Sequence, residues 1–315
     1  MEITAFLVAI APIFLLIVLG HVLRRGGIPN TEFWNLNDKL VYWVLMPALL
    51  FYKTSTIEIS LDLATSYAVV ILGGFALAFL FGLLAARLSR VGNAAGTSII
   101  QGASRHNAFI ALSVAEALFG AEGLALAALA TAMLIPVTNL TIVPTMVIMN
   151  QSREHGGLFG AILKDLGRNP LILSVGAGLT VNLTGVGEIP VLHDTAGLIG
   201  AAALPIVLMC VGANLRLRAM QTRILPLILA SIGKFAVFPV TVFLLAQWIG
   251  LTPLETFVAL LFGASPTASA AYTLARQLGG DAPLMAAITT IQTGLAFFLL
   301  PATIILAQIW FGQVY

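Results

Sequence analysis

The sequence has little charge for its length. Of 315 residues, 15 are Lys or Arg and 13 are Asp or Glu, together 9% of the chain, whereas soluble globular domains have roughly 25%. A surface that faces water needs charged side chains, so the composition excludes an ordinary soluble enzyme and a disordered chain. A net charge of +2 also argues against a nucleic-acid-binding protein, because its basic face would need clustered Lys and Arg.

Cysteine and the short motifs of many enzymes are missing as well. Cys210 is the single cysteine, which excludes a disulfide framework and a metal site built from several thiolates. The sequence contains neither a GxxxxGK[ST] phosphate-binding loop nor an HExxH zinc motif. It therefore predicts no cofactor, no metal centre and no enzymatic activity.

Long apolar stretches occupy most of the chain, with 59% apolar residues and a mean hydropathy of +1.02. A helix that crosses a bilayer needs about 20 mostly apolar residues. Ten candidate spans meet this requirement approximately: 4–23, 36–52, 64–86, 94–119, 122–149, 170–187, 195–215, 224–249, 254–276 and 281–311. The sequence thus predicts an all-α polytopic membrane protein whose surroundings are the lipid bilayer.

Basic residues are distributed unevenly between the connections of these spans. Twelve of the 15 flank the odd-numbered connections, and Lys53 is the single basic residue on the other side. The remaining two, Arg105 and Lys234, fall inside spans. Because cytoplasmic loops carry an excess of Lys and Arg, we expect a cell inner membrane protein with both termini on the non-cytoplasmic side.

The two halves of the chain share short matching segments. The triplet Gly-Ala-Ser at 102–104 recurs at 263–265, each in the middle of a span, and Pro47 in span two matches Pro205 in span seven. Two sets of five spans must run in opposite directions, because five is odd. Inverted repeats are typical of secondary transporters, with the substrate site at the midplane between the repeats. The predicted units are a first repeat at 1–150, a cytoplasmic loop at 151–169 and a second repeat at 170–315.

Spans four and nine each contain a polar cluster near their middle: Ser104, Arg105, His106 and Asn107 in one, and Ser265, Pro266, Thr267 and Ser269 in the other. Proline removes a backbone donor and clashes with the preceding turn, and small polar side chains satisfy freed backbone groups. If both helices break, two helix N-termini, each worth about half a positive charge, meet at the midplane. Arg105 adds a full charge. The pattern favours an anion, most simply a carboxylate.

Structural explanations compete with this interpretation. Asn107 is also a suitable N-cap for the second half of span four, and Pro266 also explains a simple kink. Arg105 is able to pair with the carbonyl ends of the first half-helices without meeting a substrate. For His106, a structural hydrogen-bonding role is favoured over that of a proton carrier.

Three further polar residues fall inside apolar stretches. Lys234 lies near the middle of span eight, where it either neutralises a helix C-terminus, the favoured role, or contacts the substrate. Asn139 in span five and Gln292 in span ten either line the same cavity or bridge neighbouring helices. All three stay candidate site residues, and intramembrane ionisable residues are functional by default.

Several short motifs occur in a characteristic order: GHVLRRGGI at 20–28, MPALLF at 46–51, the run 105–109, Asn169-Pro170 with Pro205 and 212–215, Lys234 with Pro239, and 264–266. Together they resemble the auxin efflux carrier family, in its bacterial branch, within the larger group of bile acid, arsenite and riboflavin transporters. The resemblance extends over nearly the whole chain. In plant PIN-type carriers the position of His106 usually holds proline, so the resemblance puts auxin in doubt as the substrate.

The resemblance implies a fold like that of NhaA and the bile-acid symporters, with ten spans in two inverted repeats whose broken helices cross. Spans one, two, six and seven would form a scaffold and a homodimer contact. Spans three to five and eight to ten would form a transport domain that moves like an elevator. Asn107 would contact a substrate carboxylate beside Pro266, and a small metabolite such as malonate is a better candidate than auxin.

The leading prediction is therefore an efflux carrier that exports a small organic anion by alternating access. A sodium- or proton-coupled uptake symporter of the bile-acid type is the first alternative, and an anion channel is the second. A membrane enzyme is disfavoured, because the spans contain no nucleophile–base pair and no metal-ligand cluster.

Overall fold

A computed structural model describes residues 3–28, 30–56, 61–150, 164, 167–216 and 224–312, and all regular elements in these ranges are helices. Six stretches are long and apolar enough to cross a bilayer: Thr4–Arg25, Asp62–Ser89, Asn93–Asn150, Leu192–Ala213, Ile224–Ile249 and Ala282–Trp310. The shorter helices Pro170–Thr184 and Pro253–Ala264 are also apolar. The chain is thus a polytopic helical membrane protein, as its composition predicted.

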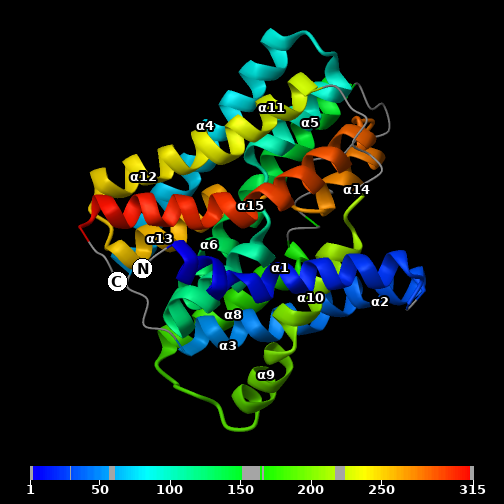
Figure 1. Ribbon diagram of the computed structural model, residues 1–315. Helices are drawn as coiled ribbons and strands as arrows, with labels where there is room; N and C mark the ends of the chain where they lie inside the picture. Colours follow the sequence, from blue (N-terminus) through cyan, green and yellow to red (C-terminus); the bar gives the residue numbers. More distant parts are fainter. Residues whose placement is uncertain are drawn as a thin grey trace.

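The helices follow one another with few long connections (Figure 1). They are α1 (Ile3–Arg25), α2 (Thr31–Leu40), α3 (Met46–Thr56), α4 (Leu61–Ser89), α5 (Asn93–Ser104), α6 (Ala108–Asn150), α8 (Pro170–Thr184), α9 (Leu192–Ala201), α10 (Ala203–Ala213), α11 (Ile224–Ile232), α12 (Phe238–Ile249), α13 (Pro253–Ala264), α14 (Ala270–Gln277) and α15 (Ala282–Trp310). In the described part of the chain, two π-helical turns join neighbouring helices, η1 (Val41–Leu45) between α2 and α3, and η3 (Gly233–Val237) between α11 and α12.

The long element α6 consists of two helices that meet at a kink. Gly120 has a φ of 62° and a ψ of −147° inside it, a conformation that glycine adopts without the steric cost of a Cβ atom. The kink lies between the stretches 94–119 and 122–149 that the sequence separated into spans four and five. A single glycine thus ends one helix and allows the next to start in a new direction.

The helices pack in two groups. In the first group, α3 packs against α8 and α9, and α1 packs against α10. In the second group, α4 packs against α5 and α12, while α13 packs against α6, α12 and α15. Figure 1 shows the first group in the lower half of the view, with α4, α5 and α11 to α15 above it.

Glycines allow the closest approach within the first group. A Cβ atom on Gly20 of α1 would overlap the backbone of Met209 in α10, and one on Gly212 of α10 would overlap the backbone of Ile17 in α1. Small residues at such contacts allow the backbones of membrane helices to approach each other closely. Two glycines, one on each helix, therefore allow the backbones of α1 and α10 to be in direct contact.

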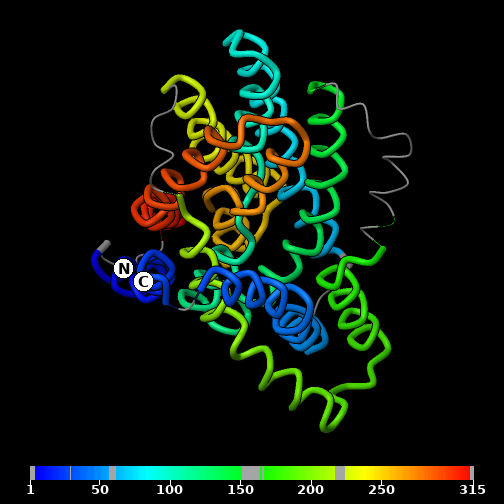
Figure 2. Tube along the Cα trace, turned by 90° about the vertical axis from the view of Figure 1, so that its right-hand side faces the viewer, coloured from blue at the N-terminus to red at the C-terminus, as the bar shows by residue number. Residues whose placement is uncertain are grey.

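Hydrogen bonds join the helix ends at one side of the molecule. The Asn150 amide donates to the Leu278 carbonyl (2.9 Å), and the Asp281 backbone N–H donates to the Ala94 carbonyl (3.1 Å). These bonds connect the end of α6, the start of α5 and the turn between α14 and α15. The N-terminal and C-terminal ends of the chain lie together on one side of the molecule (Figures 1 and 2).

Apolar side chains also cover much of the outside. Trp248 is 80% exposed and Leu198 is 78% exposed, and many other large apolar side chains on α1, α4 and α15 are exposed as well. Soluble monomers rarely expose contiguous apolar surface of this extent. The exposed apolar surface therefore fits a bilayer rather than water.

Candidate functional site at the helix crossing

Two helices are interrupted where the sequence placed its polar clusters. α5 ends at Ser104, Arg105 follows with an extended backbone (φ −71°, ψ 128°), and α6 begins at Ala108. α13 ends at Ala264, Ser265 follows with a nearly identical backbone (φ −68°, ψ 144°), and α14 begins at Ala270. Each interruption leaves a short segment of non-helical chain between two half-helices.

The two interrupted helices correspond at an offset of 160 residues. α5 (Asn93–Ser104) and α13 (Pro253–Ala264) are both 12 residues long, and both their starts and their ends differ by 160. The Gly-Ala-Ser triplets that first suggested a repeat are 161 apart, so their alignment is off by one residue relative to the helices. By helix position, Arg105 corresponds to Ser265, and His106 corresponds to Pro266.

The two breaks contact each other directly. The backbone N–H of Asn107 donates to the Ser265 hydroxyl at 3.3 Å, and that hydroxyl donates to the Phe262 carbonyl at 3.1 Å. The His106 ring also packs on Phe262, with 5.7 Å between the ring centroids. The first break is therefore held against the last turn of α13.

Asn107 caps the second half of its helix. Its Oδ1 atom accepts hydrogen bonds from the backbone N–H groups of Phe109 (3.1 Å) and Ile110 (3.3 Å), the geometry of an N-cap asparagine. This is the structural role that competed with substrate binding. The two roles are compatible, because the cap uses Oδ1 and leaves the Nδ2 donor for a ligand.

Gln292 of α15 joins the second break to α5. Its Nε2 atom donates to the Gly102 carbonyl at 3.0 Å, and its Oε1 atom accepts from the Thr267 backbone N–H at 3.0 Å. The Thr267 hydroxyl lies 2.7 Å from Oε1 and 3.1 Å from the Gly102 oxygen. Gln292 is thus a helix bridge, one of the two roles that the sequence left open, and both of its amide atoms are used in it.

Several backbone N–H groups expected to face an anion are already occupied. Those of Asn107, Phe109, Ile110 and Thr267 all donate to side chains of the protein. The positive character predicted for two free helix N-termini is therefore reduced.

Unpartnered polar atoms gather beside the crossing. Among the described residues, Arg105 Nη1, His106 Nδ1, Lys234 Nζ and both amide atoms of Gln101 are buried without a hydrogen-bond partner. Lys234 and Gln101 are 0% exposed. Buried polar groups in native proteins are almost always paired, so this set requires an explanation.

The π-helical turn η3 brings Lys234 to this place. Gly233 packs so closely on Ala103 of α5 that a Cβ atom would overlap it, and Lys234 follows at once. Its Nζ lies 4.7 Å from the centre of the Phe238 ring. Lys234 and Arg105 both lie within electrostatic range of the His106 imidazole. π-helical turns occur frequently at functional sites.

Acidic groups that would balance these cations are not buried beside them. Every described Asp and Glu side chain is exposed or half-buried, and the described residues contain no group of three or more His, Cys, Asp or Glu able to hold a metal ion. Among the described residues, the crossing therefore has two basic side chains, Arg105 and Lys234, and no buried carboxylate beside them.

Five other predicted site residues have a different setting. Ser104 donates to the Ile100 carbonyl of its own helix (2.8 Å). Asn139 is half-buried in the second part of α6 and takes no part in the hydrogen bonds of the crossing. Pro47 is the second residue of α3, which follows η1, and Pro205 lies in the first turn of α10. Ser269 starts α14 without capping it through its side chain.

Gln101 was missed by the sequence reasoning. It lies four residues before Arg105, whose backbone N–H donates to the Gln101 carbonyl at 2.8 Å, so the two residues are neighbours at the end of α5. Its polar side chain inside an apolar helix was the signal that was available. Only the tertiary structure shows that both of its amide atoms are buried and unpaired.

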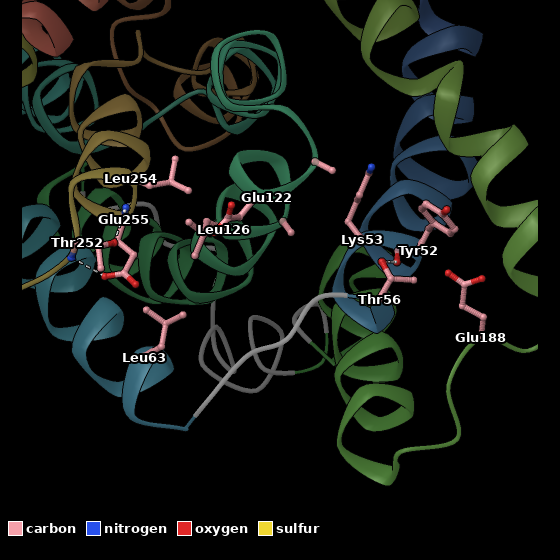
Figure 3. A pocket seen from close by; sticks show the side chains of 12 residues that line it. Tyr52, Lys53, Thr56, Leu63, Glu122, Leu126, Glu188, Thr252, Leu254 and Glu255 are labelled. Atoms are coloured by element: carbon pink, nitrogen blue, oxygen red, sulfur yellow. Dashed lines mark hydrogen bonds between the residues drawn. The ribbon is translucent and has the colours of Figure 1, made fainter. Parts of the chain in front are cut away.

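A cavity of about 530 Å³ lies between the two packing groups. Figure 3 shows side chains facing one another across it: Tyr52, Lys53, Thr56 and Glu188 on one side, and Leu63, Glu122, Leu126, Thr252, Leu254 and Glu255 on the other. Thr252 and Glu255 form a capping box at the start of α13, so the cavity lies at the far end of the half-helix that leads to Ser265.

Interrupted helices that meet beside buried basic side chains, in a polytopic helical fold, are typical of membrane transporters. A family model described as membrane transport protein matches residues 5–306. The chain belongs to this family, that of the auxin efflux carriers, which confirms the resemblance drawn from the motifs. An uncharacterized transporter of Methanocaldococcus jannaschii is 24% identical over 289 residues, which cover 89% of this chain and 92% of that protein.

Proposed function

We propose that the protein is a secondary transporter that carries a small organic anion, a carboxylate, across the cell inner membrane. The observation that carries the proposal is the group of unpartnered nitrogens on Arg105, His106 and Lys234 at the helix crossing. A buried charge without a partner costs about several kcal/mol, and a bound carboxylate would supply the missing partner. Gln101 lies in the last turn of α5, and Asn107 caps the start of α6. The Gln101 amide and the Asn107 Nδ2 donor would complete the site.

The proposed topology is ten spans in two inverted repeats. The 160-residue correspondence of α5 and α13 supports the repeat. The hydrogen-bonded helix ends support the topology, because they join connections that the basic residues flank. Arg24 donates to Asn214 (3.2 Å), and Asn214 donates to Asp38 (3.0 Å), which links the first and seventh connections.

The cavity of about 530 Å³ also supports this topology, because it lies at the opposite ends of the helices. Its lining residues come from the ends of α3, α4 and α13, from the α6 kink and from the segment after α8. These are the even-numbered connections, which the distribution of Lys and Arg assigns to the non-cytoplasmic side. We propose that both termini lie on this side as well.

Alternating access is proposed as an elevator movement between the two packing groups. The crossing belongs to the second group, and the cavity lies between this group and α3 of the first. A movement of the second group would carry the crossing toward one membrane face and then the other. The first group would be the scaffold and, as the family resemblance implies, the contact surface of a homodimer.

Ligand-induced thermal stabilisation of the purified protein tests the function. The panel contains monocarboxylates, dicarboxylates, their amides and sodium chloride, because a ligand at 100 times its Kd stabilises by about 2.7 kcal/mol. Acids should raise the Tm and amides should not. Arg105→Gln should remove the response, whereas Arg25→Gln, which alters an exposed arginine at the end of α1, should retain it.

A failure of every carboxylate to raise the Tm would overturn the organic-anion assignment. A shift that requires sodium together with the acid would replace the efflux carrier by the coupled uptake symporter. Flux in proteoliposomes that rises without saturation would replace the carrier by an anion channel.

A further inference from the structure

Lys234 has no function in the protein's own hydrogen bonding. Its Nζ atom is fully buried, has no hydrogen-bond partner among the described residues, and lies over the face of the Phe238 ring at 4.7 Å. A cation over an aromatic ring is stabilised, yet the ring satisfies none of its three N–H donors. The Lys234 Nζ is therefore a buried hydrogen-bond donor without an acceptor.

A purely structural role at a helix C-terminus does not fit the observed bonds. The Gly102 carbonyl near the end of α5 accepts from Gln292 (3.0 Å), and the Phe262 carbonyl near the end of α13 accepts from Ser265 (3.1 Å). Lys234 donates to neither of them. The role that the sequence favoured for Lys234, neutralising such an end, thus has no bond to support it.

Lys234 and Arg105 approach the crossing on different elements. Arg105 lies on the first break, and Lys234 lies on η3, which packs against α4, α5 and α13. None of the described acidic residues is buried on these elements or on α6 and α15. A substrate with one carboxylate would supply a hydrogen-bond acceptor to only one of these two basic side chains, whereas a substrate with two carboxylates would supply an acceptor to each.

We infer that Lys234 is a second anchor for the substrate, so that the site takes a dicarboxylate with one carboxylate at Arg105 and Asn107 and the other at Lys234. The inference rests on the proposed function and deepens it. It also explains the position of the π-helical turn. Gly233 of η3 packs closely on Ala103 of α5, and this contact brings the next residue, Lys234, to the end of α5.

The test compares a dicarboxylate with its half-amide of the same chain length, which has the same size and one charge fewer. Affinities are measured by titration calorimetry for the wild type, Lys234→Met and the control Lys39→Met, an exposed lysine on α2. The wild type should bind the diacid about 10- to 100-fold more tightly, the range expected for a charged hydrogen bond. Lys234→Met should lose this preference and keep its affinity for the half-amide, and Lys39→Met should behave as the wild type.

Two results would overturn the inference. One is equal affinity of the wild type for the diacid and the half-amide, and the other is a preference that survives in Lys234→Met. If Lys234→Met fails to fold, Lys234→Arg replaces it, which should keep the preference for the diacid because it keeps the charge. Failure of the proposed function itself gives a different result, since neither the diacid nor any monoacid would then bind.

Discussion

The backbone N–H of Asn107 and the hydroxyl of Ser265 form a 3.3 Å hydrogen bond between two half-helices that are far apart in sequence. The bond joins a backbone group of one break to a side chain of the other. Neither break is therefore an independent feature, because each supplies hydrogen-bonding partners for the other.

Ser265→Ala should destabilise the protein by about 1–3 kcal/mol, because it leaves the buried Asn107 N–H without an acceptor. Ser113→Ala is the matched control. That buried hydroxyl bonds only to the Phe109 carbonyl of its own helix, so its loss should have little effect, as alanine favours the helix. Thermal unfolding in detergent measures both, and equal effects would mean that the inter-break bond contributes nothing.

Asn107→Ser should separate capping from substrate binding. Serine caps a helix about as well as asparagine, whereas alanine costs about 1 kcal/mol. Both variants lack the amide donor and should lose carboxylate binding, but only Asn107→Ala should lower the Tm. Wild-type affinity in Asn107→Ser would show that the asparagine serves the helix alone.

Gln292→Leu and Gln101→Leu should have opposite consequences. The first leaves the Thr267 N–H without its acceptor and removes a donor from the Gly102 carbonyl, which should cost about 2 kcal/mol or more. The second removes an amide whose two polar atoms are buried without partners, so stability should stay equal or rise while substrate affinity falls. Unchanged affinity in Gln101→Leu would remove Gln101 from the site.

Pro266→Ala should impair transport more than stability. Proline restricts the non-helical segment after α13 to one backbone region, and alanine releases this restriction at a cost of about 0.4–1 kcal/mol. The more flexible break would position the crossing less well. Uptake into proteoliposomes and the unfolding midpoint are measured on the same preparation, and normal transport would mean that this proline is dispensable.

A cross-link across the cavity between the two packing groups should stop transport. Lys53 on α3 and Glu122 on α6 lie on opposite sides of the cavity (Figure 3). Lys53→Cys with Glu122→Cys, in a Cys210→Ala background, is treated with bifunctional thiol reagents of several lengths. The double variant should lose transport on cross-linking and recover it on reduction, and the single variants should be unaffected. Transport that continues after complete cross-linking would contradict the proposed elevator movement.

Local chemistry explains why the break positions were predictable. Both breaks fall at runs of small polar side chains, which satisfy backbone groups that a break frees. Proline alone is not sufficient, because Pro12, Pro136 and Pro301 lie inside continuous helices. The roles of the polar side chains were not predictable in the same way. Gln292 and Gln101 are the same residue type in similar apolar helices, yet one is fully bonded and the other has no partner.

The sequence by itself determined that this chain is a helical membrane protein, which family it belongs to, and where two of its helices break. These properties depend on composition, on the order of motifs and on local backbone chemistry. The tertiary structure alone decided that Lys234 reaches the crossing and that Asn107 contacts Ser265. Those contacts depend on which faces of distant helices meet, and this is set by close packing at residues such as Gly233 and Ala103 rather than by any local pattern.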